Sequence, residues 1–404
     1  PPIVLVHGIL SDPTTWAAPA WSEGAGSPVP TRMYTVDYSV AAAAANGAAA
    51  PLAWPTRGYA ENVPVLSAVI HEAIEDYRLG RDQAPGALGG THVPHRGLGG
   101  KKYAATRLDV VAHSQGGQIT RLYLSDIDTT GMLSGYSRDQ TPTTPPPAPI
   151  ADDGDYFWPP FYIRRSMEPT IGHAREYRRA NNYMAGDIRR FIPIGSPFKG
   201  SPLANALSPF MRPDNREFII DLNEFFVSAS AISQTAADIV NLLWPGPSQS
   251  LYREPTCLAD LQVGSPAQGL LEAALYPMYP RKLAWVPIVG VATTGSGNDM
   301  TQTLLWYWLS AVALPPTFDE LIATESDFVV NRWSQRNTSG PVGGSICYEF
   351  SYTSHFPVPA ILRGETNSVF ISTEGGGSVD PGSRSVKELL SGPRSHFLGR
   401  TLAR

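Results

Sequence analysis

Residues 106–124 read TRLDVVAHSQGGQITRLYL, and the fold can be worked out from this stretch. Its first part, Leu108–Ala112, is a short apolar run rich in β-branched residues, which is typical of a buried parallel strand. Its last part, Gln118–Leu124, lacks Gly and Pro and suits a helix. Between them stands His113-Ser114-Gln115-Gly116-Gly117, so the sequence predicts a strand that turns sharply into a helix.

Ser114 is flanked by small residues, with Ala112 two positions before it and Gly116 two positions after it. Between a strand and a helix, this pattern is typical of a nucleophile elbow, a strained turn with no room for large neighbours. The common form of the elbow has Gly where this chain has Ala112. We therefore predict that Ser114 is a nucleophile, with a chance motif match as the alternative.

The composition excludes some classes of protein. The chain has 404 residues with 31 Lys and Arg against 36 Asp and Glu, a net charge of −5, which argues against nucleic acid as a partner. No apolar run reaches the roughly 20 residues of a membrane span. The strand-like Ile3 follows Pro1-Pro2 at once, as in a trimmed or mature form, so the lack of a signal peptide decides little. We expect a secreted or extracytoplasmic protein. Cys257 and Cys347 would form one disulfide there, or remain two free thiols.

Apolar runs and helical spacing predict a mostly parallel sheet flanked by helices. A helix is expected over Tyr59–Arg78, where apolar residues recur at helical spacing. Strands alternate with helices along the first part of the chain, which implies right-handed crossovers. Besides the strand before Ser114, strands are predicted at Ile3–Val6, Arg32–Tyr38, Arg190–Ile194, Leu283–Ala292 and Ile346–Tyr352.

Two long segments interrupt this pattern within what we expect to be a single domain over residues 1–404. Residues 128–187 include the Pro-rich run TPTTPPPAP, and residues 203–282 are predicted to be largely helical. Both are expected to be insertions that form a lid or cap. The apolar segment Thr301–Leu314, which contains Trp306-Tyr307-Trp308, is a further candidate for the lid. It would face a lipid surface or line an acyl pocket, or else pack in the core.

A serine hydroxyl needs a general base, usually His, and a carboxylate that orients the base. On a strand-turn-helix elbow the three follow in the order Ser, acid, His. Asp327 is the preferred acid, because it lies between the last two predicted strands, and Asp299 is the alternative. His355 is the preferred base, because it directly follows the last strand, whereas His396 lies near the C-terminus.

The oxyanion of an acyl-transfer intermediate needs backbone N–H donors. Gln115 is one expected donor, because it follows the nucleophile at the start of a helix. Ile9 is the other, because His7-Gly8 forms a turn directly after the first strand. We predict no cofactor and no metal: His92 and His95 lie in a Gly-rich loop without an accompanying carboxylate or thiol.

The segments VLVHG, AHSQGG, IGSPFKGSPLA and SDFVV, followed by a late His, resemble the α/β-hydrolase lipases, especially bacterial triacylglycerol lipases and related deacylase-type esterases. The resemblance implies an α/β-hydrolase fold and the roles given above to Ser114, Asp327, His355, Ile9 and Gln115. The chain departs from the family pattern at two positions. Phe198 replaces a His in the segment after the elbow, and Phe328 replaces the Gly after the acid.

These observations predict a serine ester hydrolase, a lipase or carboxylesterase, that forms an acyl-enzyme on Ser114. The expected substrate is a small-molecule or lipid ester with an apolar acyl part, met in solution or at a lipid interface. The same groups would also serve an acyltransferase or an amide or polyester hydrolase, since the acceptor depends on how loops exclude water. A catalytically dead binding protein is the third possibility.

Overall fold

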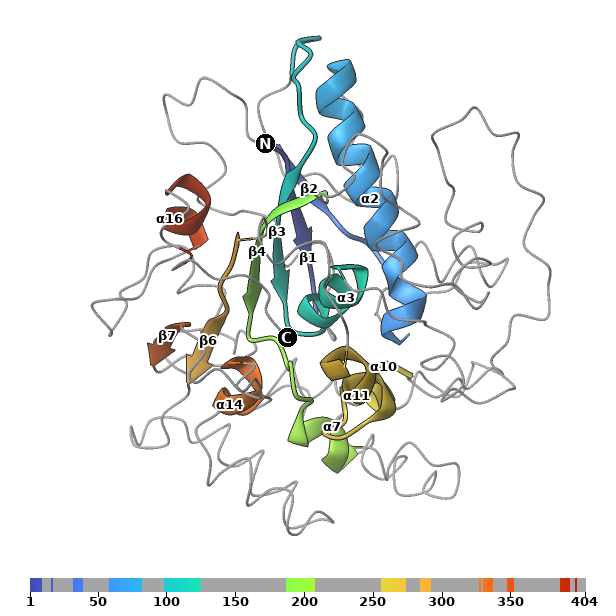
Figure 1. Ribbon diagram of the computed structural model, residues 1–404, viewed down its shortest axis with the longest axis vertical. Coiled ribbons are helices and arrows are strands. Elements are labelled where there is room, and N and C mark those ends of the chain that lie inside the picture. Colours follow the sequence, from blue (N-terminus) through green and yellow to red (C-terminus); the bar gives the residue numbers. More distant parts are fainter. Residues whose placement is uncertain are drawn as a thin grey trace, which may run out of the picture. The chain divides into compact units, whose positions relative to one another are not determined.

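Figure 1 shows the computed structural model of residues 1–404. The chain forms two compact units. The first contains Pro1–Pro193, Gly269–Val286 and Gly392–Arg404, and the second contains Ile194–Gln268 and Pro287–Ser391. The structure describes residues 1–8, 16, 32–38, 58–81, 98–124, 187–207, 256–273, 284–291, 327, 330–336, 347–351, 386–392 and 397.

The first unit is built on a parallel sheet. Strand β1 (Ile3–Val6) lies between β2 (Met33–Thr35) and β3 (Leu108–His113), and both pairings are parallel. Strand β4 (Ile188–Ile194) follows β3 in the strand order and pairs in parallel with the short β5 (Ala284–Trp285). Every residue of β1, β2 and β3 is buried, which explains the apolar runs of β1 and of Val110–Ala112 in β3.

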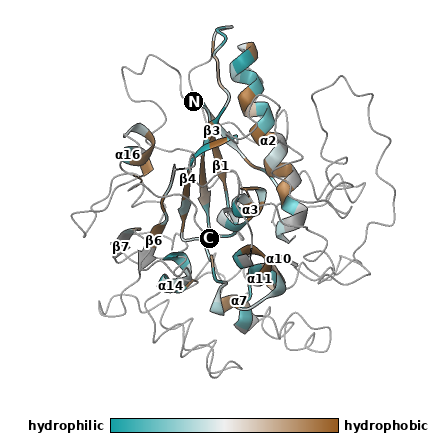
Figure 2. Cartoon of the chain, viewed as in Figure 1, coloured by the Kyte–Doolittle hydropathy of each residue, from teal (hydrophilic) through white to brown (hydrophobic). Residues whose placement is uncertain are grey.

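Two helices cover this sheet. Helix α2 (Tyr59–Leu79) packs on α3 (Gln115–Leu124) and on strands β1, β2 and β3. Figure 2 shows both hydrophobic and hydrophilic residues along α2, as expected for a helix with one face in the core. The first unit therefore confirms the predicted parallel sheet flanked by helices, including the long helix that begins at Tyr59.

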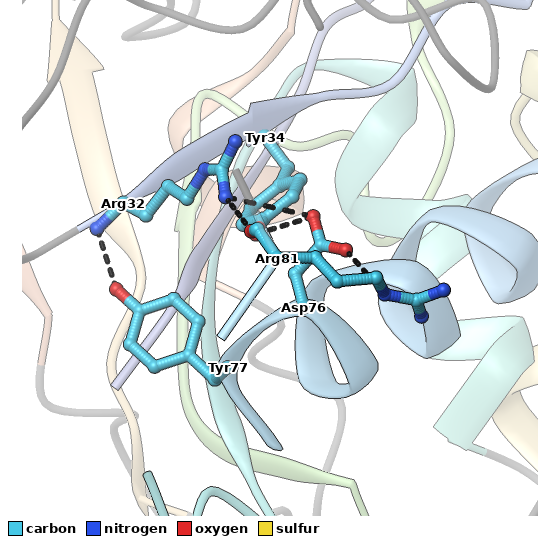
Figure 3. A network of polar contacts seen from close by, with 5 residues as sticks. All are labelled: Arg32, Tyr34, Asp76, Tyr77 and Arg81. Carbon is cyan, nitrogen blue, oxygen red and sulfur yellow. Dashed lines mark hydrogen bonds and ion pairs between the residues drawn. The ribbon is translucent and has the colours of Figure 1, made fainter. Parts of the chain in front are cut away.

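A polar network joins β2 to the end of α2 (Figure 3). The buried Arg32 donates from its backbone N–H to the Tyr77 hydroxyl at 2.7 Å and from its guanidinium to the Arg81 carbonyl at 2.7 Å. Tyr34 donates its hydroxyl to Asp76 at 3.1 Å, and Arg32 and Arg81 lie 3.7 and 3.5 Å from the same carboxylate. The buried carboxylate thus faces two cations and a hydroxyl, which offsets its desolvation.

Glu72, one turn before Asp76 on α2, gives the first prediction. Burial, with the nearby Asp76 carboxylate adding to it, raises the pKa of Glu72 to about 7, against the opposing charges of Arg32 and Arg81. A carboxyl whose pKa is higher in the folded protein than in the unfolded chain makes folding less favourable as pH rises from about 4.5 to 7. Glu72→Gln should therefore stabilise the protein by about 2 kcal/mol at pH 8 and leave it unchanged at pH 4.

Urea unfolding of both proteins at the two pH values measures this difference. Glu388→Gln, at an exposed position of α16 (Val386–Ser391), is the matched control for the loss of one carboxylate. An equal stability gain for Glu72→Gln at pH 4 and pH 8 would mean that ionisation is not its cause.

The second unit also contains parallel strand pairs. Ile194, the last residue of β4, pairs with Ile288 of β6 (Ile288–Val291), and β6 pairs with β7 (Tyr348–Ser351). Helix α14 (Arg332–Arg336) packs on β6, and α7 (Pro202–Leu207) packs on α10 (Thr256–Leu261). Helix α11 (Pro266–Ala273) spans the boundary between the units.

Several predicted features differ from the structure or lie outside the described residues. The strand expected over Leu283–Ala292 is two strands, β5 and β6, separated by Val286-Pro287. No disulfide joins Cys257 and Cys347. Of the predicted insertions, α7, α10 and α11 belong to residues 203–282 or border them; the segment Thr301–Leu314 and residues 128–186 lie outside the described part.

None of the helices within the described ranges is both long and apolar enough to cross a membrane. Within the same ranges, no three His, Cys, Asp or Glu side chains are grouped so that they would hold a metal ion. His92 and His95 lie outside them.

Candidate active site

Ser114 is the single residue between β3, which ends at His113, and α3, which begins at Gln115. Its φ is +52°, in the left-handed region that L-residues with side chains rarely adopt. The Gly117 N–H donates to the Ser114 carbonyl at 3.0 Å, which closes the first turn after the strand. Such strain persists only where the surroundings impose it, and it is concentrated at functional sites.

Gly116 allows α3 to approach the end of β1. A Cβ at this position would lie 2.7 Å from the Val6 carbonyl oxygen and 2.8 Å from that of His7. Both are backbone atoms of a buried strand end, which has little freedom to shift. The small residue two positions after Ser114 is therefore required by the packing of α3 against β1, as the elbow pattern predicts.

Gly8 brings the segment after β1 against the nucleophile. A Cβ at Gly8 would lie 2.5 Å from the Cβ of Ser114, far inside the contact distance of two carbons. The buried His7 ring donates from Nδ1 to the Gly8 carbonyl at 3.0 Å and packs edge-on against Tyr38, with ring centroids 4.8 Å apart. The His7-Gly8 segment is thus fixed beside Ser114.

This close approach gives the second prediction. Gly8→Ala should lower the rate of any reaction at Ser114 by about 100-fold or more, because the new methyl group must displace the serine or the loop. The rate of Ser114 modification by a fluorophosphonate measures the effect directly.

Gly269→Ala is the matched control for Gly8→Ala. Gly269 lies in α11, where an added Cβ meets no atom within 4 Å, and alanine favours a helix. This control should keep the wild-type rate. If Gly8→Ala also kept it, the His7-Gly8 segment would not be part of the site.

Gln115 is the first residue of α3 and is fully buried. The first N–H groups of a helix have no carbonyl partner within it, and they lie at the positive end of the helix dipole. A backbone donor at this position, directly after the serine, suits an oxyanion. Ile9, the other expected donor, lies outside the described residues.

Asp327, the expected acid, belongs to the second unit and is fully buried. Its Oδ1 accepts the Val330 N–H at 2.8 Å, and its own N–H donates to the Val330 carbonyl at 3.3 Å. The Gln335 side chain donates to the same carbonyl at 2.9 Å. The carboxylate is thus built into a tight turn that α14 supports.

Ser114, Gln115 and the His7-Gly8 segment are brought together in the first unit. Asp327 is described in the second unit, and the alternative acid Asp299 and the histidines His355 and His396 lie outside the described residues. His113 is buried next to Ser114, and Phe198 is a fully buried core side chain.

The sequence did not indicate Ser334 and Gln335. Their hydrogen bonds connect the turn closed by Asp327 and Val330, which we call the acid turn, to its surroundings. Neither residue type nor spacing marks them out, because Ser and Gln are common in short polar helices. The nearest signal is their position a few residues after Asp327.

Comparisons with known proteins give matches in structure but not in sequence. No protein-family model matches the chain, and no curated protein matches it. Among solved structures, the mature lipase BlEst2 of Bacillus licheniformis is similar at 14% identity and a TM-score of 0.37, over 90% of this chain and 87% of that one.

Two further bacterial structures are similar to a comparable degree. The Staphylococcus hyicus lipase is 13% identical over 88% of this chain and 87% of its own, with a TM-score of 0.38. EstA of Clostridium botulinum is 15% identical over 92% and 85%, with a TM-score of 0.39. At these identities, function has to be inferred from the residues of this chain.

Proposed function

We propose that the chain is a serine hydrolase that cleaves carboxylic esters with an apolar acyl part, as a lipase or carboxylesterase does. The observation that carries the proposal is the conformation of Ser114. It has a positive φ between a buried parallel strand and a helix, and Gly8 packs directly against its Cβ. A core position with no chemical role would gain nothing from this strain.

In the proposed reaction, the Ser114 hydroxyl attacks the ester carbonyl while His355 accepts its proton. The tetrahedral oxyanion is held by the backbone N–H groups of Gln115 and Ile9. The C–O bond to the alcohol then breaks, and His355 returns the proton to the leaving alkoxide, which leaves an acyl-enzyme. Water then attacks the acyl carbonyl as His355 takes its proton. The bond from the acyl carbon to the Ser114 oxygen breaks, and His355 returns the proton to that oxygen as the acid leaves.

Asp327 orients the imidazole of His355 and stabilises its charged form in this scheme. Burial of the carboxylate suits the role, because an ion pair with imidazolium is stronger away from bulk water. The bond from the Val330 N–H would fix one carboxylate oxygen and thereby limit rotation of the side chain.

Active-site labelling tests the proposal most directly. A fluorophosphonate should form a covalent adduct on Ser114, located by peptide mass spectrometry, and hydrolysis of p-nitrophenyl esters should be lost in step with labelling. A preference for long acyl chains would identify a lipase, and a preference for short ones a carboxylesterase. Absence of both adduct and hydrolysis would contradict the proposal of an enzyme and would favour a binding protein.

A further inference from the structure

Helix α14 follows the acid turn immediately and is too short to be stable alone. It has five residues, whereas isolated helices need about 12–15 residues to form in water. Its position is therefore set by tertiary contacts, of which one is its packing on β6. Helix α14 also supports the acid turn. Gln335 of α14 donates to the Val330 carbonyl, and the Val330 N–H donates to the Asp327 carboxylate.

Ser334 attaches α14 to the loop after β4. Its Oγ accepts the Lys199 N–H at 3.0 Å and donates to the Gly200 carbonyl at 2.7 Å. The side chain is fully buried, so water does not replace these bonds readily if the hydroxyl is lost. One hydroxyl thus satisfies two neighbouring backbone groups of another segment.

The loop that Ser334 contacts is itself held at both ends. The Gly195 N–H donates to the Ile288 carbonyl of β6 at 2.9 Å, and the Ser201 N–H donates to the Leu261 carbonyl of α10 at 2.7 Å. Gly200, at a φ of +88°, lies close to the turn at Val263-Gly264 that follows α10. A Cβ at Gly200 would be 2.6 Å from the Val263 nitrogen. The loop over residues 195–201 is therefore held in place by its contacts with β6 and α10.

We propose that Ser334 is a positioning residue for Asp327. A continuous series of hydrogen bonds and short covalent links runs from the anchored 195–201 loop through Ser334, Gln335 and Val330 to the carboxylate. The inference rests on the proposed function, since it matters only if Asp327 orients the catalytic base. Loss of the Ser334 hydroxyl would let α14 and the acid turn shift, and the imidazolium would be less well stabilised.

The test compares Ser334→Ala with Ser265→Ala. Ser265 is buried in the same unit and makes a similar pair of bonds, donating to the Asp260 carbonyl at 2.8 Å and accepting the Gln268 N–H at 3.2 Å. Both variants should lower Tm. Only Ser334→Ala should also reduce kcat for a p-nitrophenyl ester by about 10- to 100-fold with KM little changed.

The pH profile separates positioning from general stability. In Ser334→Ala the acid limb of kcat/KM should move to lower pH, because a displaced carboxylate no longer raises the pKa of the base as strongly. Ser334→Thr, which keeps the hydroxyl, should restore the wild-type limb. Ser334→Cys keeps the volume with a weaker acceptor and serves if the alanine variant does not fold; it should show the same shift.

The outcomes distinguish this inference from the proposed function. If the wild type neither hydrolyses esters nor reacts with the fluorophosphonate, both fail. If the wild type is active but Ser334→Ala or Ser334→Cys has the same kcat and pH limb as Ser265→Ala, the proposed function stands and the positioning role of Ser334 is overturned.

Discussion

Ser114→Ala should lower kcat for a p-nitrophenyl ester by about 10⁵- to 10⁶-fold, because removal of the nucleophile disables the whole catalytic unit. A residual rate above that of the uncatalysed reaction would remain if the oxyanion donors still bind the substrate. The variant should also gain no fluorophosphonate adduct. The strained φ of +52° is as unfavourable for alanine as for serine, so the fold should be unaffected.

Ser67→Ala is the matched control for Ser114→Ala. Ser67 is also a fully buried serine of the first unit, on α2, and its hydroxyl has no hydrogen-bond partner in the described structure. Replacing it removes an unsatisfied polar group and improves helix propensity, so activity should be unchanged and stability equal or higher. Ser114→Ala with wild-type kcat would exclude Ser114 as the nucleophile and with it the proposed mechanism.

The sequence predicts the parts of the first unit where local pattern and packing agree. β1 has the predicted bounds, Ile3–Val6, and the elbow has the predicted strand, turn and helix around Ser114. Helix α3 begins at Gln115, the expected oxyanion donor, and it includes Gly116 and Gly117 before the Gly-free run Gln118–Leu124. Helix propensity disfavours Gly, but close approach to β1 requires it at position 116.

Features that depend on partners distant in the sequence were not predictable in this way. Pro287, which lacks an N–H, can be seen within the apolar run Leu283–Ala292 and marks where the ladder breaks. The pairing of β5 and β6 with different parts of β4 cannot be read from the run itself. Likewise, the bonds of Ser334 to the loop after β4 span 134 and 135 residues. Nothing local to either segment encodes such a contact.

Asp327→Asn should lower kcat by about 10⁴-fold, the scale expected when an acid can no longer hold the base in the right tautomer. The asparagine Oδ1 can still accept the Val330 N–H, so the turn over residues 327–330 should persist and the loss should reflect charge. Asp327→Ala removes the turn bond as well and should additionally lower Tm.

The choice between two acids makes this experiment decisive for the proposed mechanism. Asp299→Asn, measured in parallel, should retain kcat within a fewfold of wild type, because the resemblance of the SDFVV segment to the lipase acid segment assigns the role to Asp327. The reverse result, with activity kept in Asp327→Asn and lost in Asp299→Asn, would transfer the role to Asp299. The hydrogen bonds of Asp327 would then stabilise only a buried turn, and the positioning role of Ser334 would fall with them. Because both variants remove one negative charge, the change in net charge is the same and cannot account for a difference between them.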